Sequence, residues 1–312
     1  MEKKLLVTGG AGFIGSNLID LIAAKSPEWT IRVIDDFSSG LEENIRSSSV
    51  EITRGSILNT TKLDLAARGV DSIIHLAAIG SVPRSISAPR ATHDANVTGT
   101  LNVLEAARQN NVQQVIVASS SSVYSSNPSL PRTEFDWTRP LSPYAASKLA
   151  TESYANAYGK SYGMENLAFR FFNVYGPRQR ADHPYAAVIP KFISAAVSGH
   201  QLQIFGDGNQ SRDFTYVDSV CEAIYIACQY RVTCVHPVNL AFGTRTSLNE
   251  LIATLEKNLG HELDVEHLDA RIGDVRESQA DTNLLDSMFP LLRPTPLDEG
   301  LNRTIQWYLG LS

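Results

Sequence analysis

A tyrosine and a lysine, Tyr144 and Lys148, stand four residues apart in the segment LSPYAASKLA (residues 141–150). The surrounding pattern predicts a helix over Pro143–Tyr162, and residues four apart on a helix share one face. A tyrosine with a pKa of about 10 is a weak base near neutral pH. A neighbouring ammonium lowers that pKa because it stabilises the phenolate. The pair therefore predicts a proton-transfer site in which Tyr144 is the base.

A run of four serines, Ser119–Ser122, follows the apolar segment Val115–Ala118, which predicts a strand. The carboxyl ends of strands in an open α/β sheet are the usual place for ligand contacts. A serine hydroxyl at this point can bridge a substrate hydroxyl and Tyr144. Serines also simply end strands, and we expect this plainer interpretation to hold for at least two of the four.

The segment TGGAGFIG (residues 8–15) places Gly9, Gly12 and Gly15 between a short apolar run and a helical pattern. In a dinucleotide-binding turn, the first glycine permits the tight turn, the second lets a pyrophosphate approach, and the third lets helix and strand pack closely. The helix N-terminus supplies N–H groups and a partial positive charge for the phosphates. Asp35 follows at the end of the next strand, where a carboxylate accepts hydrogen bonds from ribose hydroxyls. Because a carboxylate there repels a 2′-phosphate, the sequence predicts NAD rather than NADP.

Apolar runs alternate with helical patterns through the first half of the chain. The predicted strands are Leu5–Thr8, Ile31–Asp35, Ile73–Leu76, Val115–Ala118 and Asn166–Phe171, and the predicted helices are Ile14–Ala24, Asn96–Gln109 and Pro143–Tyr162. Short apolar strands separated by helices are typical of βαβ units and of a parallel sheet covered on both faces. The fold class is therefore α/β. The second half is less regular, with a clear helical pattern at Ser247–Leu259.

The composition excludes several classes of function. The 312 residues are 43% hydrophobic and 19% charged, and a net charge of −6 offers no electrostatic footprint for nucleic acid or an anionic membrane. The three cysteines form no CxxC pair and the seven histidines no HExxH motif, so we expect neither a disulfide framework nor a metal site. Free thiols fit a reducing cytoplasm. We expect no signal peptide and no membrane span.

Several segments taken together resemble one enzyme family. They are TGGAGFIG, HLAA (75–78), NVTGT (96–100), SSSSVY, YAASK, RFFNVYGPR (170–178) and GDGNQSRDFTYVD (206–218). From Leu5 to about Asp281 the chain resembles the extended short-chain dehydrogenase/reductase family, and within it the nucleotide-sugar 4-epimerases. The resemblance implies a Rossmann-type doubly wound sheet that holds NAD, at residues 1–174 with an interleaved return near 213–242. It implies a smaller C-terminal α/β domain at 175–312 that mainly binds a UDP-sugar.

The resemblance also implies roles for individual residues. Tyr144 is the base, Lys148 is its modulator, and Ser120 is the hydroxyl near the sugar O4. The implied cofactor contacts are Gly9, Gly12, Phe13, Ile14, Gly15, Asp35, Asp36, Ser56, Ile57, Leu76, Ala77, Ala78, Asn96, Ser119, Tyr144 and Lys148. The implied substrate contacts are Ser81, Ser120, Ser121, Ser122, Tyr144, Asn173, Arg180, Val188, Phe205, Arg212, Arg271, Asp274 and Ser278. Arg212 and Arg271 resemble arginines that bind the diphosphate, which suits a negatively charged chain.

Two positions depart from the family pattern. Ser56 stands where the family usually has an aspartate near the adenine, and Ser125 replaces a usual glycine after Tyr124. The first departure weakens the expected adenine contact, and the second affects only the local loop.

The serines also bear on the type of reaction. The related 4,6-dehydratases carry an acidic pair directly after the catalytic hydroxyl residue, because elimination of water needs an acid and a base. Here Ser121 and Ser122 occupy those positions. Epimerisation needs only removal and return of hydride at C4, with Tyr144 taking the hydroxyl proton. The sequence therefore favours an isomerase.

Three substrates remain open. Ser278 lies where the family has a gate beside the hexose, and a small residue there leaves room for an N-acetyl group. The segments GSVPRS (80–85) and YAAVIPKF (185–192) also resemble UDP-N-acetylglucosamine epimerases. The segment PRQR instead resembles UDP-glucuronate 4-epimerases, in which the arginine corresponding to Arg180 binds the sugar carboxylate. UDP-glucose is the third substrate.

The sequence leaves two other classes of function open, and the family resemblance implies a homodimer. A net oxidoreductase would use the same groups but exchange its nicotinamide at every turnover, whereas a non-catalytic NAD-binding module would not need Tyr144 or Lys148. In the family, the helices at 96–109 and 143–162 pair into a four-helix homodimer interface. Apolar residues on these helices that we expect to be exposed are Leu101, Leu104, Leu149 and Tyr154.

Overall fold

A computed structural model describes residues 2–47, 49–182, 186–269 and 276–310. In this part of the chain the main sheet has seven parallel strands in the order β11–β6–β5–β4–β1–β2–β3. They are β1 (Lys4–Thr8), β2 (Thr30–Asp35), β3 (Glu51–Arg54), β4 (Ser72–His75), β5 (Gln114–Ser120), β6 (Glu165–Phe171) and β11 (Val238–Leu240). From β1 the chain builds first toward β3 and then, from β4, toward the opposite edge. Sheets of this kind bind ligands beyond the carboxyl ends of the strands where the direction changes.

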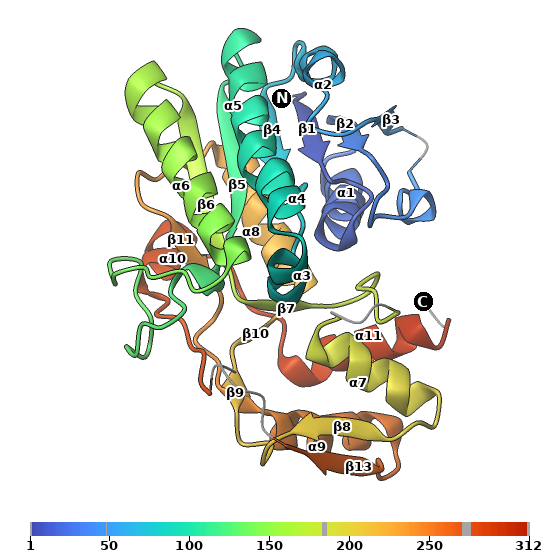
Figure 1. The fold of residues 1–312 in the computed structure, drawn as a ribbon. Coiled ribbons are helices and arrows are strands. Elements are labelled where there is room, and N and C mark those ends of the chain that lie inside the picture. Colours follow the sequence, from blue (N-terminus) through green and yellow to red (C-terminus); the bar gives the residue numbers. More distant parts are fainter. Residues whose placement is uncertain (1, 48, 183–185, 270–275, 311–312) are drawn as a thin grey trace.

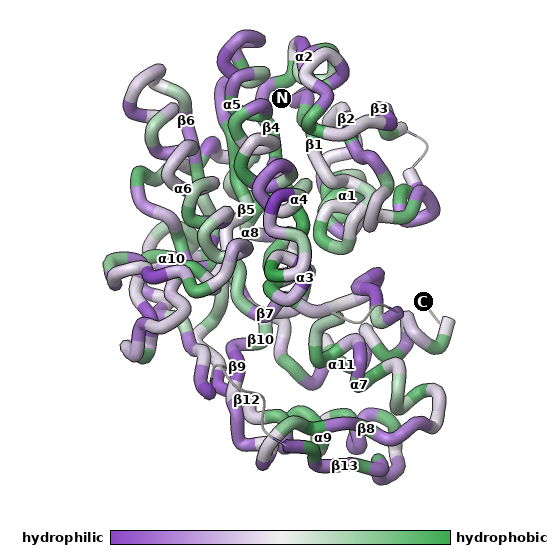
Figure 2. The backbone as a smooth tube through the Cα atoms, in the orientation of Figure 1, coloured by the Kyte–Doolittle hydropathy of each residue, from purple (hydrophilic) through white to green (hydrophobic). Residues whose placement is uncertain are grey.

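Helices cover both faces of the sheet (Figure 1). The helical segments of this half are α1 (Phe13–Lys25), η1 (Glu42–Asn44), α2 (Thr60–Ala67), α3 (Val82–Ser87), α4 (Pro89–His93), the π-helical η2 (Asp94–Thr98), α5 (Gly99–Gln109), η3 (Ser121–Val123), α6 (Pro143–Tyr162) and α8 (Val217–Tyr230). Successive strand residues point to opposite faces. Leu5 and Val7 accordingly join a core cluster with α1 and α8, while Leu6 joins a second cluster with α2 and α5. Figure 2 shows hydrophobic colour on the strands around β4, whereas α4 is hydrophilic.

The remaining elements form a smaller unit below the sheet in Figure 1. They are β7 (Asn173–Tyr175), α7 (Val188–Val197), β8 (Leu202–Phe205), β9 (Ser211–Arg212), β10 (Phe214–Tyr216), β12 (Thr246–Ser247), α9 (Leu248–Leu259), β13 (Val265–Leu268) and α11 (Leu297–Tyr308). Their strands pair only two at a time, as β10–β7, β12–β9 and β13–β8. The short helix α10 (Asn283–Met288) instead packs beside β11 at the edge of the main sheet. In the described residues, no helix combines the length and the apolar character that a membrane crossing needs.

Helix α6 carries the tyrosine and the lysine, and its start is strongly determined. Ser142 caps it by accepting a hydrogen bond from the Ala145 N–H at 3.1 Å, and Pro143 fills the first position. These are the residue types that favour the beginning of a helix. Gly163 ends α6 in the left-handed conformation (φ 67°). The predicted bounds of this helix are confirmed.

The predicted fold class is confirmed, and the differences lie at element ends and in the second half. The helix predicted over Asn96–Gln109 begins at Gly99, because residues 94–98 form the π-helical η2. The strand predicted to end at Leu76 ends at His75. Residues 217–240 return to the sheet as α8 and β11, and α8 packs beside α1. One helix residue expected to be exposed, Leu104, is instead fully buried against the sheet.

Candidate active site

The glycine turn joins β1 to α1, and its backbone leaves no room for side chains. Gly9 has φ +73°, and a Cβ there would lie 2.7 Å from the Ala77 backbone N. A Cβ on Gly15 would lie 2.4 Å from the Gly9 O. The first N–H groups of α1, from Phe13 onward, have no partner within the helix and add a partial positive charge. The turn therefore fits a pyrophosphate, as NAD requires.

Asp35 ends β2 beside this turn. Its Oδ2 accepts from the Ala11 N–H at 2.9 Å and its Oδ1 from the Phe37 N–H at 2.8 Å. Burial raises the pKa of Asp35, and these two backbone hydrogen bonds act against the rise. Two carboxylate oxygens offer about four acceptor positions, so lone pairs remain for ribose hydroxyls.

A single cavity of about 1520 Å³ contains most of the predicted cofactor residues. Those that line it are Gly9, Gly12, Phe13, Ile14, Gly15, Asp35, Asp36, Ser56, Ile57, Leu76, Ala77, Ala78, Ser119, Tyr144 and Lys148. The volume exceeds that of a usual single-ligand pocket, about 300–1,000 Å³. The cavity therefore has room for a dinucleotide and a second nucleotide.

Asn96 does not line the cavity, contrary to its predicted cofactor contact. It is 1% exposed, and its Oδ1 accepts from the Ile79 N–H at 2.8 Å. Its Nδ2 donates to the Ile79 O at 3.2 Å and to the Ser147 Oγ at 2.9 Å. With both ends of its amide engaged, Asn96 ties the segment after β4 to α6.

The three predicted reacting residues meet at the carboxyl end of β5. Ser120 is the last residue of β5, and Tyr144 and Lys148 come from the first turns of α6, so all three line the cavity. The Lys148 Nζ donates to the Ala118 O at 2.8 Å. Ser120 hydrogen-bonds Tyr144, and its Oγ also accepts from the Ser122 N–H at 3.2 Å.

Burial dominates the ionisation of both titratable groups. It raises the pKa of Tyr144, and the hydrogen bond with Ser120 acts against that rise. Burial also lowers the pKa of Lys148 to about 8, although the negative charge of Glu152 acts to raise it. The lowering of the Tyr144 pKa expected from Lys148 is not found, because burial is the largest influence on this hydroxyl and Ser120 is the group that acts against it. A positive charge on the ligand at this point would favour the phenolate.

Of the other serines of the run, Ser119 lines the cavity and Ser121 and Ser122 do not. Ser119 is 2% exposed and donates to the carboxylate of Glu152. Ser121 and Ser122 form η3 and do not line the cavity, so their predicted substrate contacts are not found. This agrees with the expectation that at least two of the four serines only end the strand.

The sequence interpretation missed a buried ion pair beside the reacting residues. Glu152 of α6 and Arg170 of β6 are joined by two hydrogen bonds of 2.9 Å. The signal was available, because Glu152 stands four residues after Lys148, as Lys148 stands four after Tyr144. Continuation of that helical face predicts a carboxylate next to the lysine.

The opposite wall of the cavity comes from the smaller unit and the loops that lead to it. The predicted substrate residues that line the cavity there are Asn173, Arg180, Val188, Phe205 and Arg212, whereas Ser81 lines it from the start of α3, after β4. Ser278 does not line it: the residue is 6% exposed, and its N–H donates to the Ser211 O at 3.2 Å. Arg271 and Asp274 lie outside the described residues.

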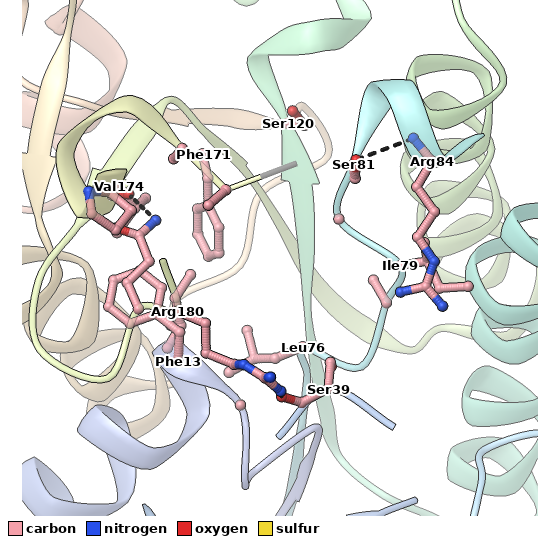
Figure 3. A pocket seen from close by; sticks show the side chains of 18 of the residues that line it. Phe13, Ser39, Leu76, Ile79, Ser81, Arg84, Ser120, Phe171, Val174 and Arg180 are labelled. Atoms are coloured by element: carbon pink, nitrogen blue, oxygen red, sulfur yellow. Dashed lines mark hydrogen bonds between the residues drawn. The ribbon is translucent and has the colours of Figure 1, made fainter. Parts of the chain in front are cut away.

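The geometry of Arg180 differs from the predicted carboxylate contact. Its Nε and Nη2 donate to the Asp182 carboxylate at 2.8 and 2.7 Å, and its Nη1 donates to the Ser39 O at 3.3 Å. Figure 3 shows the side chain extended toward Ser39, well apart from Ser120. Ser39 stands four residues after Asp35 in the chain, so the guanidinium is directed to the loop after β2.

Comparisons with known proteins agree with this geometry. Residues 5–241 match the NAD dependent epimerase/dehydratase family. The chain belongs to this family. It is therefore an enzyme of the extended short-chain dehydrogenase/reductase type, and its cofactor is NAD, as predicted.

Several known proteins are similar to the chain over nearly its whole length. A UDP-glucose 4-epimerase of Mycolicibacterium smegmatis is 35% identical over 99% of both chains. A UDP-N-acetylglucosamine 4-epimerase from Methanobrevibacter ruminantium, solved with UDP-N-acetylmuramic acid, is 36% identical with a TM-score of 0.94 over 100% of this chain and 99% of that one. A UDP-glucuronic acid 4-epimerase from Bacillus cereus, solved with UDP-glucuronic acid and NAD, is 30% identical with a TM-score of 0.88 over 99% and 100%. The relatives share an isomerase activity and differ in their sugars.

Proposed function

We propose that the protein is a UDP-hexose 4-epimerase that inverts C4 through a transient 4-keto sugar. The observation that carries this proposal is the meeting of Ser120, Tyr144 and Lys148 at one end of a cavity with room for two nucleotides. The chemistry that bound NAD supplies is reversible hydride transfer with the sugar C4, so no net oxidation results. The glycine turn and Asp35 hold this cofactor.

The chain's own residues move the proton. Tyr144 removes the proton from the O4 hydroxyl as the C4–H bond breaks, and returns it when hydride comes back to the other face. Ser120 hydrogen-bonds the same oxygen and orients it. Lys148 stabilises the phenolate form of Tyr144 with its ammonium. Neither Ser121 nor Ser122 lines the cavity, and serines are poor acids and bases, so elimination of water is disfavoured.

For the substrate, we infer that the hexose is neutral and propose UDP-N-acetylglucosamine. The guanidinium of Arg180 is held by Asp182 and Ser39, so a sugar carboxylate would have to displace an existing carboxylate partner. Residues of the two segments that resemble N-acetylglucosamine epimerases line the cavity, among them Ser81 and Val188. The similarity to a UDP-N-acetylglucosamine 4-epimerase over the whole chain supports the same choice.

UDP-glucuronate is the second candidate, because Arg180 does line the cavity and an arginine fork suits a carboxylate. The two candidates are separated by kcat/KM for UDP-N-acetylglucosamine, UDP-glucose and UDP-glucuronate under identical conditions. We expect the first to be highest and UDP-glucuronate to be at least about tenfold lower, since a desolvated unpaired carboxylate costs more than about 1.4 kcal/mol. A higher value for UDP-glucuronate would contradict the neutral substrate.

A further inference from the structure

A buried ion pair lies one helical turn beyond Lys148. Glu152 of α6 accepts from Arg170 of β6 through both carboxylate oxygens, at 2.9 Å each. The two side chains are 7% and 4% exposed. Desolvation offsets most of the attraction in such a pair, so stability alone is a weak reason for its presence. Its position beside the reacting lysine indicates a role in the site.

Two consecutive residues of β5 connect the ion pair to the lysine. The Ala118 O accepts from the Lys148 Nζ at 2.8 Å, and the neighbouring Ser119 donates from Oγ to the Glu152 Oε1. Lys148 and Glu152 also stand one turn apart on the same face of α6. The end of β5 therefore fixes the ammonium and the carboxylate relative to each other.

The charges around Lys148 leave Glu152 as the carboxylate that acts on it. Burial lowers the pKa of Lys148 to about 8, and the negative charge of Glu152 acts in the opposite direction. On the other side lies His75 of β4, whose pKa burial and Lys148 lower to about 3, so it is neutral. Tyr144 lies one turn earlier on α6, where burial raises its pKa.

Arg170 balances Glu152 from β6. Its Nη1 donates to the Tyr124 Oη at 2.8 Å and to the Glu134 O at 3.3 Å. The Tyr124 hydroxyl in turn donates to the Asn239 Oδ1 at 2.7 Å. Burial raises the pKa of Tyr124 to about 12, so this group is neutral as well. The Arg170 guanidinium is thus held by several partners. Replacing Arg170, or removing the carboxylate that pairs with it, changes the charge near Lys148.

We propose that Glu152 is a positioning residue for the reaction: its ion-paired carboxylate keeps the buried Lys148 side chain charged and in place, so that its ammonium can serve Tyr144. The proposal rests on the proposed function for the roles of these two residues. Arg170 holds the carboxylate in position and offsets part of its charge. Glu152 is thereby added to the three reacting residues, as the group that maintains the charge of Lys148.

The test measures the ionisation of Lys148 without turnover. The purified holoenzyme is acetylated competitively over a range of pH, and mass spectrometry follows the peptide that contains Lys148. In Glu152→Gln the positive charge of Arg170 stays without its partner, so the midpoint of Lys148 should fall by about one pH unit or more. In the double variant Glu152→Gln/Arg170→Met the carboxylate is still absent, so the midpoint should remain below the wild-type value even though no unpaired charge is left. Exposed Lys257 is the internal control, and its midpoint should not move.

The variant Arg170→Met removes the cation of the ion pair and so tests the opposite change in charge near Lys148. It leaves the Glu152 carboxylate without its cation, so the Lys148 midpoint should rise or stay, and a fall would overturn the proposal. An unchanged midpoint in Glu152→Gln, or a wild-type midpoint in the double variant, would overturn it too. The alkaline limb of the pH profile of kcat should move with the midpoint, which a merely structural role would not cause. Since acetylation needs no turnover, a protein that fails to epimerise refutes the proposed function while the midpoints still decide the role of Glu152.

Discussion

The two walls of the cavity are built in different ways. The cofactor wall consists of the ends of β1, β2, β4 and β5 and of the turns that follow them, all parts of one hydrogen-bonded sheet. The substrate wall consists of the loop after β6, the start of α7, and β8 and β9, whose strands pair only two at a time. Neighbouring strands fix positions on the cofactor wall, whereas the substrate wall depends on contacts between segments far apart in the chain. We therefore expect substitutions in the cofactor wall to disturb cofactor retention and stability, and those in the substrate wall to change the choice of sugar.

The largest effect should come from Tyr144, where the two walls meet. Tyr144→Phe keeps the ring and removes only the hydroxyl, so kcat should fall by about 10²–10⁴-fold, the usual contribution of a general base. The measurement is the initial rate of epimer formation. Bound NAD per protomer, measured in the same preparations, should stay at the wild-type value. A kcat within tenfold of the wild type would contradict the role of Tyr144.

Two glycines that line the cavity, Gly15 in the tight turn and the exposed Gly80, distinguish close backbone packing from open space. Gly15→Ala places a methyl group 2.4 Å from the Gly9 O, a backbone atom that cannot move aside. The free energy of unfolding should fall by about 1–3 kcal/mol, and NAD should be lost on dialysis. The matched control is Gly80→Ala, since no atom lies within 4 Å of the added Cβ. Its free energy should change by less than about 0.5 kcal/mol. Equal effects in the two variants would show that the turn is not closely packed.

The pH dependence of kcat should follow the ionisation of the Lys148 side chain. Its pKa is lowered to about 8, so the charged form that assists Tyr144 is present below that pH and lost as pH rises through it. We expect kcat to fall by about tenfold per pH unit above this point. The control is Lys148→Met, which should have a low kcat without this alkaline limb. A limb that persists in Lys148→Met belongs to another group.

Arg180 tests the substrate wall. Because its guanidinium is directed to Asp182 and Ser39, Arg180→Ala should lower kcat/KM for all three UDP-sugars by a similar, few-fold factor. The ratio of kcat/KM values is the quantity to measure, since it is insensitive to partial misfolding. A loss for UDP-glucuronate about thirtyfold larger than for UDP-N-acetylglucosamine would make Arg180 the carboxylate partner, as a desolvated charge pair requires.

The smallest effect on activity should come from the outer face of α6. Tyr154 is 37% exposed there, and Leu101 and Leu149 are partly exposed. We expect the wild type to be a homodimer through these helices. Tyr154→Arg should produce a monomer by light scattering with kcat changed less than about twofold. A monomeric wild type at micromolar concentration would exclude this interface.

The sequence was informative where chemistry and local structure coincide. The glycine turn, Asp35 and the helix with Tyr144 and Lys148 were predicted because each signal lies within one helix or one βαβ unit. Leu104 was misjudged because a helix that packs on a sheet buries its apolar face just as a helix in a dimer interface does. The burial of Ser278 and the direction of Arg180 were not predicted, because both depend on partners such as Ser211 and Ser39 that no local pattern specifies.

Proton NMR of the purified enzyme with UDP-N-acetylglucosamine, without added NAD, tests the central claim most directly. We expect an equilibrium mixture of the two C4 epimers, formed with no accumulation of NADH in the absorbance spectrum. The same mixture should be reached from UDP-N-acetylgalactosamine. Stoichiometric NADH without a second epimer would make the protein a net oxidoreductase, and an unchanged spectrum for all three UDP-sugars would contradict the epimerase function.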